Sequence, residues 1–155
     1  MTSEPATTAH TLPKHADALR RMIGFFETLT PQTASRVDHI YSPDAFFKDP
    51  FNEVTGTAEI QRLFEHMFAQ VDAARFIVTT QLLQDDQAFL TWDFLFRMKR
   101  FSRAEQCIRG ATHLRFDADS RICLHRDYWD AAEELYEKLP VLGGLMRLLK
   151  RAARN

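Results

Sequence analysis

The sequence predicts an α+β fold in which helices pack on one face of a strongly bent antiparallel sheet. In the first half of the chain, apolar residues recur at helical spacing. From residue 75 onward, long segments alternate in the manner of strands. A length of 155 residues fits one ordinary domain. Helices followed by consecutive strands with short turns are typical of an antiparallel meander covered by helices.

Three helices are predicted before the long strands, over residues 14–29, 30–41 and 57–71. The second begins with Thr30 and Pro31, an N-cap residue followed by a proline at the first helical position. The first and third each carry an apolar face at the spacing of a helix that packs on a core. These faces comprise Leu19, Met22, Ile23, Phe26 and Leu29 in the first, and Ile60, Leu63, Phe64, Met67, Phe68 and Val71 in the third.

A turn is predicted at residues 42–44, and a short strand at residues 45–49 precedes a return strand at residues 53–56. Pro50 ends the first of these strands, because proline has no N–H to donate to a neighbouring strand. The long strands are expected over residues 75–84, 88–100, 106–116 and 122–129. Helical segments follow, the last of them over residues 141–154.

Composition excludes several classes of protein. A formal net charge of -1 and a pI near 6.6 argue against nucleic acid as a partner. Two cysteines, Cys107 and Cys123, without a zinc-type spacing predict neither a disulfide framework nor a metal site, and no cofactor is expected. Residues 1–13 are expected to be a flexible polar lead-in, and the protein is expected to be cytoplasmic. Thirteen phenylalanines favour an aromatic core or pocket.

Two segments resemble a known family. They are residues 40–51 (IYSPDAFFKDPF), followed by Gly56 and an amphipathic helix, and residues 115–130, which contain RFDADSRI and HRDYWD. The chain is similar over residues 14–130 to the nuclear-transport-factor-2-like superfamily, and more closely to its ketosteroid isomerase and SnoaL-like branches. The resemblance implies a cone, in which a curved sheet wraps a long helix and encloses a deep, mostly apolar pocket. It also implies a small apolar ligand and a homodimer.

Asp49 matches the general base of the isomerases, which moves a proton between carbons beside a carbonyl. A carboxylate in an apolar cavity is desolvated and becomes a stronger base. This sequence differs from the isomerases at the oxyanion hole, where Phe25 and Thr112 stand in place of a tyrosine and a protonated aspartic acid. Phenylalanine donates no hydrogen bond, and a threonine hydroxyl is a weaker donor. The alternative role for Asp49 is an Asp-Pro turn residue that accepts hydrogen bonds from its own backbone.

The last strand offers a second candidate base. Strict alternation places Cys123, His125, Asp127 and Trp129 on one face and Ile122, Leu124, Arg126 and Tyr128 on the other. SnoaL-like cyclases use an aspartate base, so Asp127 rivals Asp49, and its carboxylate is expected to orient the imidazole of His125, a third candidate catalytic residue. Alternatively Asp127 pairs with Arg126 or Arg109, and His125 is a satisfied buried histidine. The predicted ligand-binding residues are Phe25, Tyr41, Phe64, Trp92, Phe94, Thr112 and Trp129.

Two functions follow from this resemblance and these residues. One is an isomerase or cyclase that uses an aspartate base, and the other is a non-catalytic ligand-binding or protein-interaction module. The homodimer is expected to pair through the outward face of the third and fourth long strands. Residues 131–155 form a predicted helical extension, basic on one side, that packs over the pocket or at the dimer interface. The alternative for this extension is contact with a membrane surface or a partner.

Overall fold

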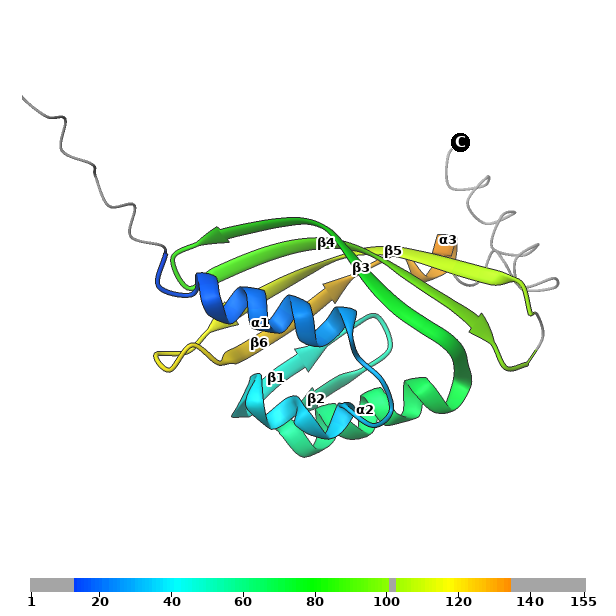
Figure 1. Ribbon diagram of the computed structural model, residues 1–155, viewed down its shortest axis with the longest axis horizontal. Coiled ribbons are helices and arrows are strands. Elements are labelled where there is room, and N and C mark those ends of the chain that lie inside the picture. Colours follow the sequence, from blue (N-terminus) through cyan, green and yellow to red (C-terminus); the bar gives the residue numbers. More distant parts are fainter. Residues whose placement is uncertain (1–12, 101–102, 135–155) are drawn as a thin grey trace, which may run out of the picture.

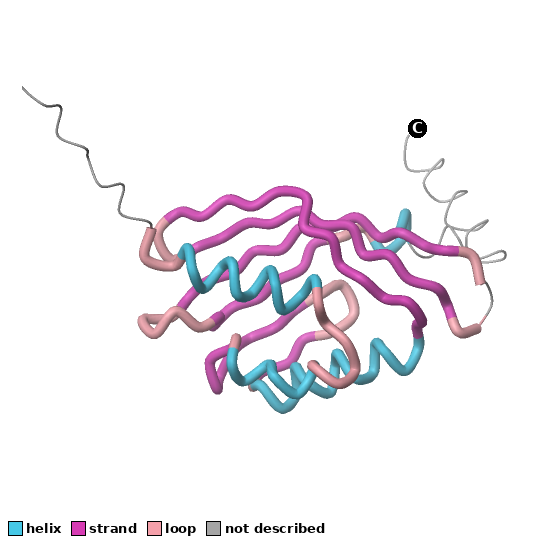
Figure 2. The backbone as a smooth tube through the Cα atoms, in the orientation of Figure 1, coloured by secondary structure: helices cyan, strands magenta, loops and turns pink. Residues whose placement is uncertain are grey.

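Six strands form one curved sheet, with the helices α1 and α2 against its inner side (Figure 1). The computed structural model describes residues 13–100 and 103–134. The strand order is β2-β1-β6-β5-β4-β3, and Figure 2 shows the strands as one continuous layer. The predicted α+β fold is therefore confirmed. The strands are β1 (Tyr41–Lys48), β2 (Glu53–Thr55), β3 (Val71–Gln84), β4 (Gln87–Met98), β5 (Glu105–Phe116) and β6 (Ile122–Tyr128).

The helices form where the apolar spacing predicts them. They are α1 (Ala16–Glu27), the 3-10 helix η1 (Ala34–His39), α2 (Thr57–Gln70) and the short α3 (Ala131–Glu134). The second predicted helix differs, because it begins later and takes the tighter 3-10 form. Thr30 and Thr33 hold the turn before it, each accepting a hydrogen bond on its hydroxyl from the backbone N–H of the other, at 3.2 and 2.8 Å.

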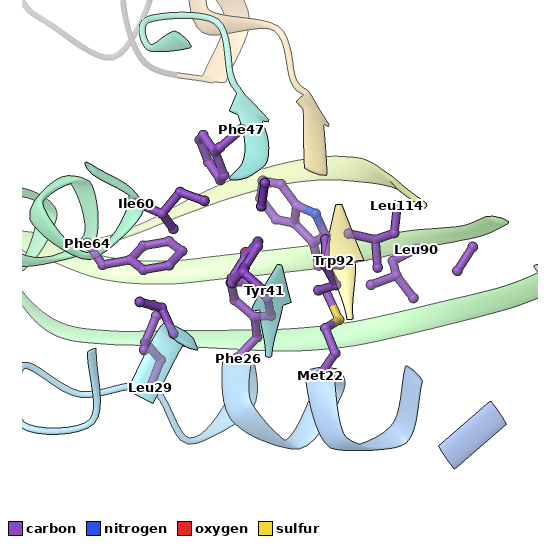
Figure 3. Packing of buried hydrophobic residues seen from close by; sticks show 14 of the residues in the cluster. Met22, Phe26, Leu29, Tyr41, Phe47, Ile60, Phe64, Leu90, Trp92 and Leu114 are labelled. Atoms are coloured by element: carbon purple, nitrogen blue, oxygen red, sulfur yellow. The ribbon is translucent and has the colours of Figure 1, made fainter. Parts of the chain in front are cut away.

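The core lies between the inner face of the sheet and these helices (Figure 3). Met22 and Phe26 of α1 and Phe64 of α2 reach toward Trp92 and Leu90 of β4. Each of these five residues is at most 7% exposed. Their burial gives the apolar driving force that fixes both helices on the sheet.

One pairing in the sheet is parallel, which the predicted meander did not include. The four long strands pair antiparallel as expected, but β6 also pairs with β1 in parallel. Tyr41 lies opposite Ile122, while Phe46 lies opposite Leu124, so β1 carries an irregularity between these two positions. The predicted turn at residues 42–44 is wrong, because these residues belong to this irregular part of β1.

The predicted alternation on β6 is also wrong at its start. Arg115 pairs with Leu124 and Phe116 with Ile122, which leaves Cys123 as an extra residue in a bulge. The bulge changes the alternation, so Ile122 is fully buried in the core. Beyond the bulge the prediction holds, and His125 and Asp127 face inward, where both line a cavity.

Most of the predicted C-terminal extension lies outside the described residues. The structure describes it only as α3, so the helix over residues 141–154 is not part of this description, nor is the lead-in up to residue 12. Among the described helices, none is both long enough and apolar enough to span a bilayer.

Candidate functional site

A cavity of about 430 Å³ opens between α2, the β1–β2 hairpin and the inner face of the sheet. Its walls are mainly aromatic and aliphatic, and its polar groups lie on α2, in the turn after β1 and on β6. A concave site of this composition is typical of small-molecule pockets. The apolar lining includes Phe47, Phe51, Val54, Leu63, Phe64, Met67, Val71, Phe76, Trp92, Phe94, Phe96, Met98, Ile108 and Trp129.

Asp127 lies where this cavity meets a smaller one. The smaller cavity, about 30 Å³, lies deeper, between α1 and β4, and is lined by Met22, Phe26 and Leu90 together with Thr112 and His125. Asp127 lines both cavities, and its side chain is 17% exposed. The carboxylate is thus accessible from the larger cavity but surrounded mostly by apolar groups.

A chain of hydrogen bonds converges on one oxygen of this carboxylate. The Trp92 indole N–H donates to Thr112 Oγ1 at 2.7 Å, and Thr112 Oγ1 donates to Asp127 Oδ1 at 2.5 Å. His125 Nε2 lies 2.8 Å from the same Oδ1. No hydrogen bond from a described residue reaches Oδ2. The second oxygen is therefore the one available to a ligand.

His125 is held in place by aromatic rings and by a tyrosine. Its side chain is 3% exposed, and its ring centroid lies 4.6 Å from that of Phe47 and 5.5 Å from that of Phe26. Its Nδ1 lies 2.8 Å from the Tyr41 hydroxyl. Burial, and secondarily the charge of Asp127, raise the pKa of Tyr41 well above its ordinary value, so the phenol keeps its proton.

Asp49 lies at the rim of the larger cavity, where its carboxylate is occupied by its own turn. Oδ1 accepts hydrogen bonds from the backbone N–H groups of Phe51 at 2.8 Å and Asn52 at 2.6 Å. The Asn52 side-chain amide lies 3.0 Å from both carboxylate oxygens. These contacts agree with the turn role left open in the sequence, and they engage both oxygens of the Asp49 carboxylate, whereas Asp127 has one unengaged oxygen.

Most of the predicted site residues come together, and two do not. Asp127, His125, Thr112, Phe64, Trp92, Phe94 and Trp129 all line one or both cavities. Phe25 lines neither, because the inward position on α1 belongs to its neighbour Phe26. Tyr41 also lines neither; it is 1% exposed and lies behind His125. The predicted direct contact of Phe25 and Tyr41 with a ligand is therefore corrected.

The alternative partners of Asp127 are not used. Among the described residues, Asp127 lies within hydrogen-bond distance of His125 and forms an ion pair with neither Arg126 nor Arg109. The Arg126 guanidinium lies 4.8 Å above the Tyr128 ring on the outer face of the sheet. Since odd positions after the Cys123 bulge point inward, Arg126 is directed away from its neighbour's carboxylate.

Phe26, Phe47 and Phe76 are site residues that the prediction did not name. All three line a cavity. A signal existed for Phe26, because it lies on the apolar face of the predicted first helix. In the described part of the chain, no group of three or more His, Cys, Asp or Glu residues is placed to hold a metal ion.

Comparison with known proteins identifies the family. The model of the SnoaL-like domain matches residues 22–125. A protein with a ketosteroid isomerase-like fold from Catenulispora acidiphila, solved in complex with trimethylamine, has a TM-score of 0.66 at 15% identity over 77% of this chain and 90% of its own. A proposed SnoaL-like polyketide cyclase from Shewanella putrefaciens has a TM-score of 0.65 at 16% identity over 81% and 98%.

An LEH-like epoxide hydrolase from M. tuberculosis has a TM-score of 0.62 at 16% identity over 88% of this chain and 96% of its own. At such identities these likenesses concern the fold, which hosts different reactions. No curated protein matches the chain. Because the family model covers more than half of its length, the chain belongs to the SnoaL-like domain family.

Proposed function

We propose that this protein binds a small, mostly apolar carbonyl compound in the larger cavity and moves a proton on it, with Asp127 as the general base. The observation that carries the proposal is the asymmetry of the Asp127 carboxylate. Oδ1 is engaged by Thr112 and His125, whereas Oδ2 has no partner among the described residues. A positioned carboxylate with one unengaged oxygen in an apolar cavity meets the requirements of a general base.

The proposed ligand class follows from the walls of the cavity. The Phe76, Phe94 and Phe96 rings stack in sequence, with centroids 4.4 and 5.0 Å apart and interplanar angles of 21° and 22°. Such an aromatic wall favours a flat apolar molecule that can pack against the rings. The polar groups of the rim lie on α2, where Arg62 and His66 are solvent-accessible, and suit a polar end that stays near water.

In the proposed step, Asp127 Oδ2 takes a proton from a carbon beside a carbonyl. The electron pair of the broken C–H bond moves onto the carbonyl oxygen and gives an enolate. In an isomerisation, the protonated carboxyl then returns the proton to another carbon of the conjugated system. In a cyclisation, the enolate carbon attacks a second carbonyl of the same molecule, and that oxygen takes the proton.

The substrate itself must supply part of the stabilisation of the enolate. The donors closest to Asp127 are already engaged, since Trp92 donates to Thr112, and Thr112 and His125 bond to Oδ1. Loss of one oxyanion donor costs about 10²–10³ in rate. We therefore favour carbon acids whose carbanion is delocalised over more than one carbonyl or over an extended conjugated system.

The second candidate is a non-catalytic binding module of the same fold. It is favoured by the same engagement of donors, because a pocket that only binds needs no group to stabilise an enolate. The two functions differ in what Asp127 must do. A base must accept a proton from carbon, whereas a binding residue only accepts a hydrogen bond.

Turnover of 5-nitrobenzisoxazole distinguishes the proton-transfer enzyme from the non-catalytic binding module. This flat, apolar carbon acid loses a proton to a base and opens to a coloured nitrophenolate that needs no oxyanion donor. We expect the wild-type protein to catalyse the opening, and Asp127→Asn to lower the rate by about 10²-fold or more. Asp49→Asn should retain turnover. Loss of turnover in Asp49→Asn alone would move the base to Asp49, and a wild-type rate equal to that of Asp127→Asn would favour the binding module.

A further inference from the structure

Tyr41 lies outside the cavities yet contacts the residue that supports the base. It begins β1, opposite Ile122 in the parallel pair with β6, and its side chain is 1% exposed. Its hydroxyl reaches across this pair to His125 Nδ1 at 2.8 Å. A buried phenolic hydroxyl needs an acceptor for its proton. Among the described residues, His125 Nδ1 is its single hydrogen-bonding partner.

This requirement assigns the protons on His125. Nδ1 can accept from Tyr41 only when it carries no proton, so the proton of a neutral imidazole is on Nε2. Nε2 lies 2.8 Å from Asp127 Oδ1 and therefore donates to it. On the other side, the Trp92 N–H can only donate, so Thr112 accepts from it and donates its own proton to Oδ1. Each donor in these two series of hydrogen bonds is thus directed toward Asp127 Oδ1.

Packing keeps the imidazole in this orientation. The Tyr41 and His125 rings are nearly parallel, with an interplanar angle of 19° and centroids 6.0 Å apart. The Phe47 and Phe26 rings lie against His125 from β1 and α1. The ring is therefore supported on several sides, but packing alone does not distinguish its two tautomers. The groups at its two nitrogens do, because the Tyr41 hydroxyl donates to Nδ1 and the Asp127 carboxylate accepts from Nε2.

We propose that Tyr41 is a positioning residue of this site, which fixes the Nε2-protonated tautomer of His125 and so leaves Asp127 Oδ2 as the basic oxygen. The inference rests on the proposed function insofar as Asp127 is a base. Without the Tyr41 hydroxyl, the buried Nδ1 lone pair would have no donor, and only the Asp127 carboxylate would still favour a proton on Nε2. The Nδ1-protonated tautomer would then gain population, and in it the Nε2 lone pair faces Oδ1, which removes one of the two hydrogen bonds that orient the carboxylate.

Nitrogen NMR of the full-length protein tests this assignment without any turnover. In a long-range proton–nitrogen spectrum of ¹⁵N-labelled protein, the His125 signals are identified by their loss in His125→Gln. We expect a protonated Nε2 and an unprotonated Nδ1 in the wild type, and a mixture of tautomers in Tyr41→Phe. Tyr128→Phe is the matched control, because Tyr128 is 49% exposed on the outer face and should leave the spectrum unchanged.

A protonated Nδ1 in the wild-type spectrum would overturn the proposal, and this measurement needs no variant of Tyr41. An unchanged His125 spectrum in a folded Tyr41→Phe would overturn it as well. With 5-nitrobenzisoxazole, Tyr41→Phe should lower kcat by about 3- to 10-fold, the value of one hydrogen bond, with little change in KM. If Asp127→Asn retains turnover while the spectra behave as expected, the proposed function fails and the tautomer assignment stands.

Discussion

Gly110 on β5 lies directly against the indole of Trp92 on β4, its cross-strand partner. A Cβ atom added at Gly110 would lie 2.4 Å from the Trp92 Cη2 atom and 2.5 Å from Cζ2. No real contact is this short, so the ring lies where a side chain at Gly110 would otherwise project. The absence of a side chain at Gly110 thereby allows the Trp92 N–H to reach Thr112.

Gly110→Ala should displace the indole and weaken the hydrogen bonds that lead to Asp127. We expect a loss of about 1–3 kcal/mol in the free energy of unfolding, as for other overpacked cores. Gly24→Ala on α1 is the control, because nothing lies within 4 Å of its added Cβ. That change should instead stabilise the helix by about 0.5–1 kcal/mol. Urea unfolding, followed by tryptophan fluorescence, measures both changes. Equal changes in the free energy of unfolding for the two variants would contradict the prediction.

The sequence predicts well what depends on local periodicity. Trp92, Phe94 and Phe96 alternate along one strand, and they form the inner wall as expected. The same rule places His125 and Asp127 together on the inner face. In each case the side-chain direction follows from positions two residues apart, without reference to the rest of the chain.

What the sequence could not predict depends on contacts between distant strands. The bond from Tyr41 to His125 exists because β1 pairs in parallel with β6, and periodicity carries no information on the order of strands in a sheet. The bulge at Cys123 likewise arises from how β5 and β6 align. The resemblance to the isomerases places Phe25 at the site, although the helical spacing of the apolar face favours Phe26.

The outer face of the sheet leads to a prediction on assembly. It exposes Phe89 (51%) and Tyr128 (49%). Ala111 of β5 lies near its centre, paired with Thr91 of β4 on one side and with Tyr128 of β6 on the other. We propose a homodimer that buries this face, because it mixes apolar and polar groups as interfaces do. Residues expected there are Arg109, Ala111, His113, Leu124 and Tyr128.

Light scattering at tens of micromolar protein should therefore give the mass of a dimer. Ala111→Arg should give a monomer, because a long charged side chain at the centre of the face prevents close approach. Ala58→Arg, at an exposed position of α2 away from the sheet, is the control and should remain dimeric. A monomeric wild-type protein would refute the assembly.

His113 on this face should make stability depend on pH. Its ring stacks on Phe89 with centroids 4.5 Å apart, and Nε2 lies 2.9 Å from Gln87 Oε1. Burial, and secondarily the charge of Arg115, lower the pKa of His113 below its ordinary value of 6.5. The unfolded chain thus binds this proton first as the pH falls, so stability is lost from about pH 6.5 down to the folded pKa.

Urea unfolding between pH 7 and pH 5, at one protein concentration, should show this loss in the wild type. In His113→Gln the loss should be smaller, because glutamine does not titrate. The carboxylates and the remaining histidines contribute equally to the pH dependence of both proteins, so their contributions cancel in the comparison. A wild type and variant with parallel pH profiles would show that His113 does not contribute.

Thr112 links Trp92 to Asp127, and its hydroxyl is 2.7 Å from the indole nitrogen and 2.5 Å from Oδ1. Thr112→Val keeps the shape of the side chain but leaves a buried N–H without an acceptor and Oδ1 with one donor fewer. We expect a loss of about 1–3 kcal/mol in the free energy of unfolding, the cost of unsatisfied buried groups. Thr112→Ser keeps the hydroxyl, removes only a methyl group, and should lose less. If valine is tolerated as well as serine, the hydrogen bonds through Thr112 do not stabilise the site, because the two variants differ chiefly in the hydroxyl.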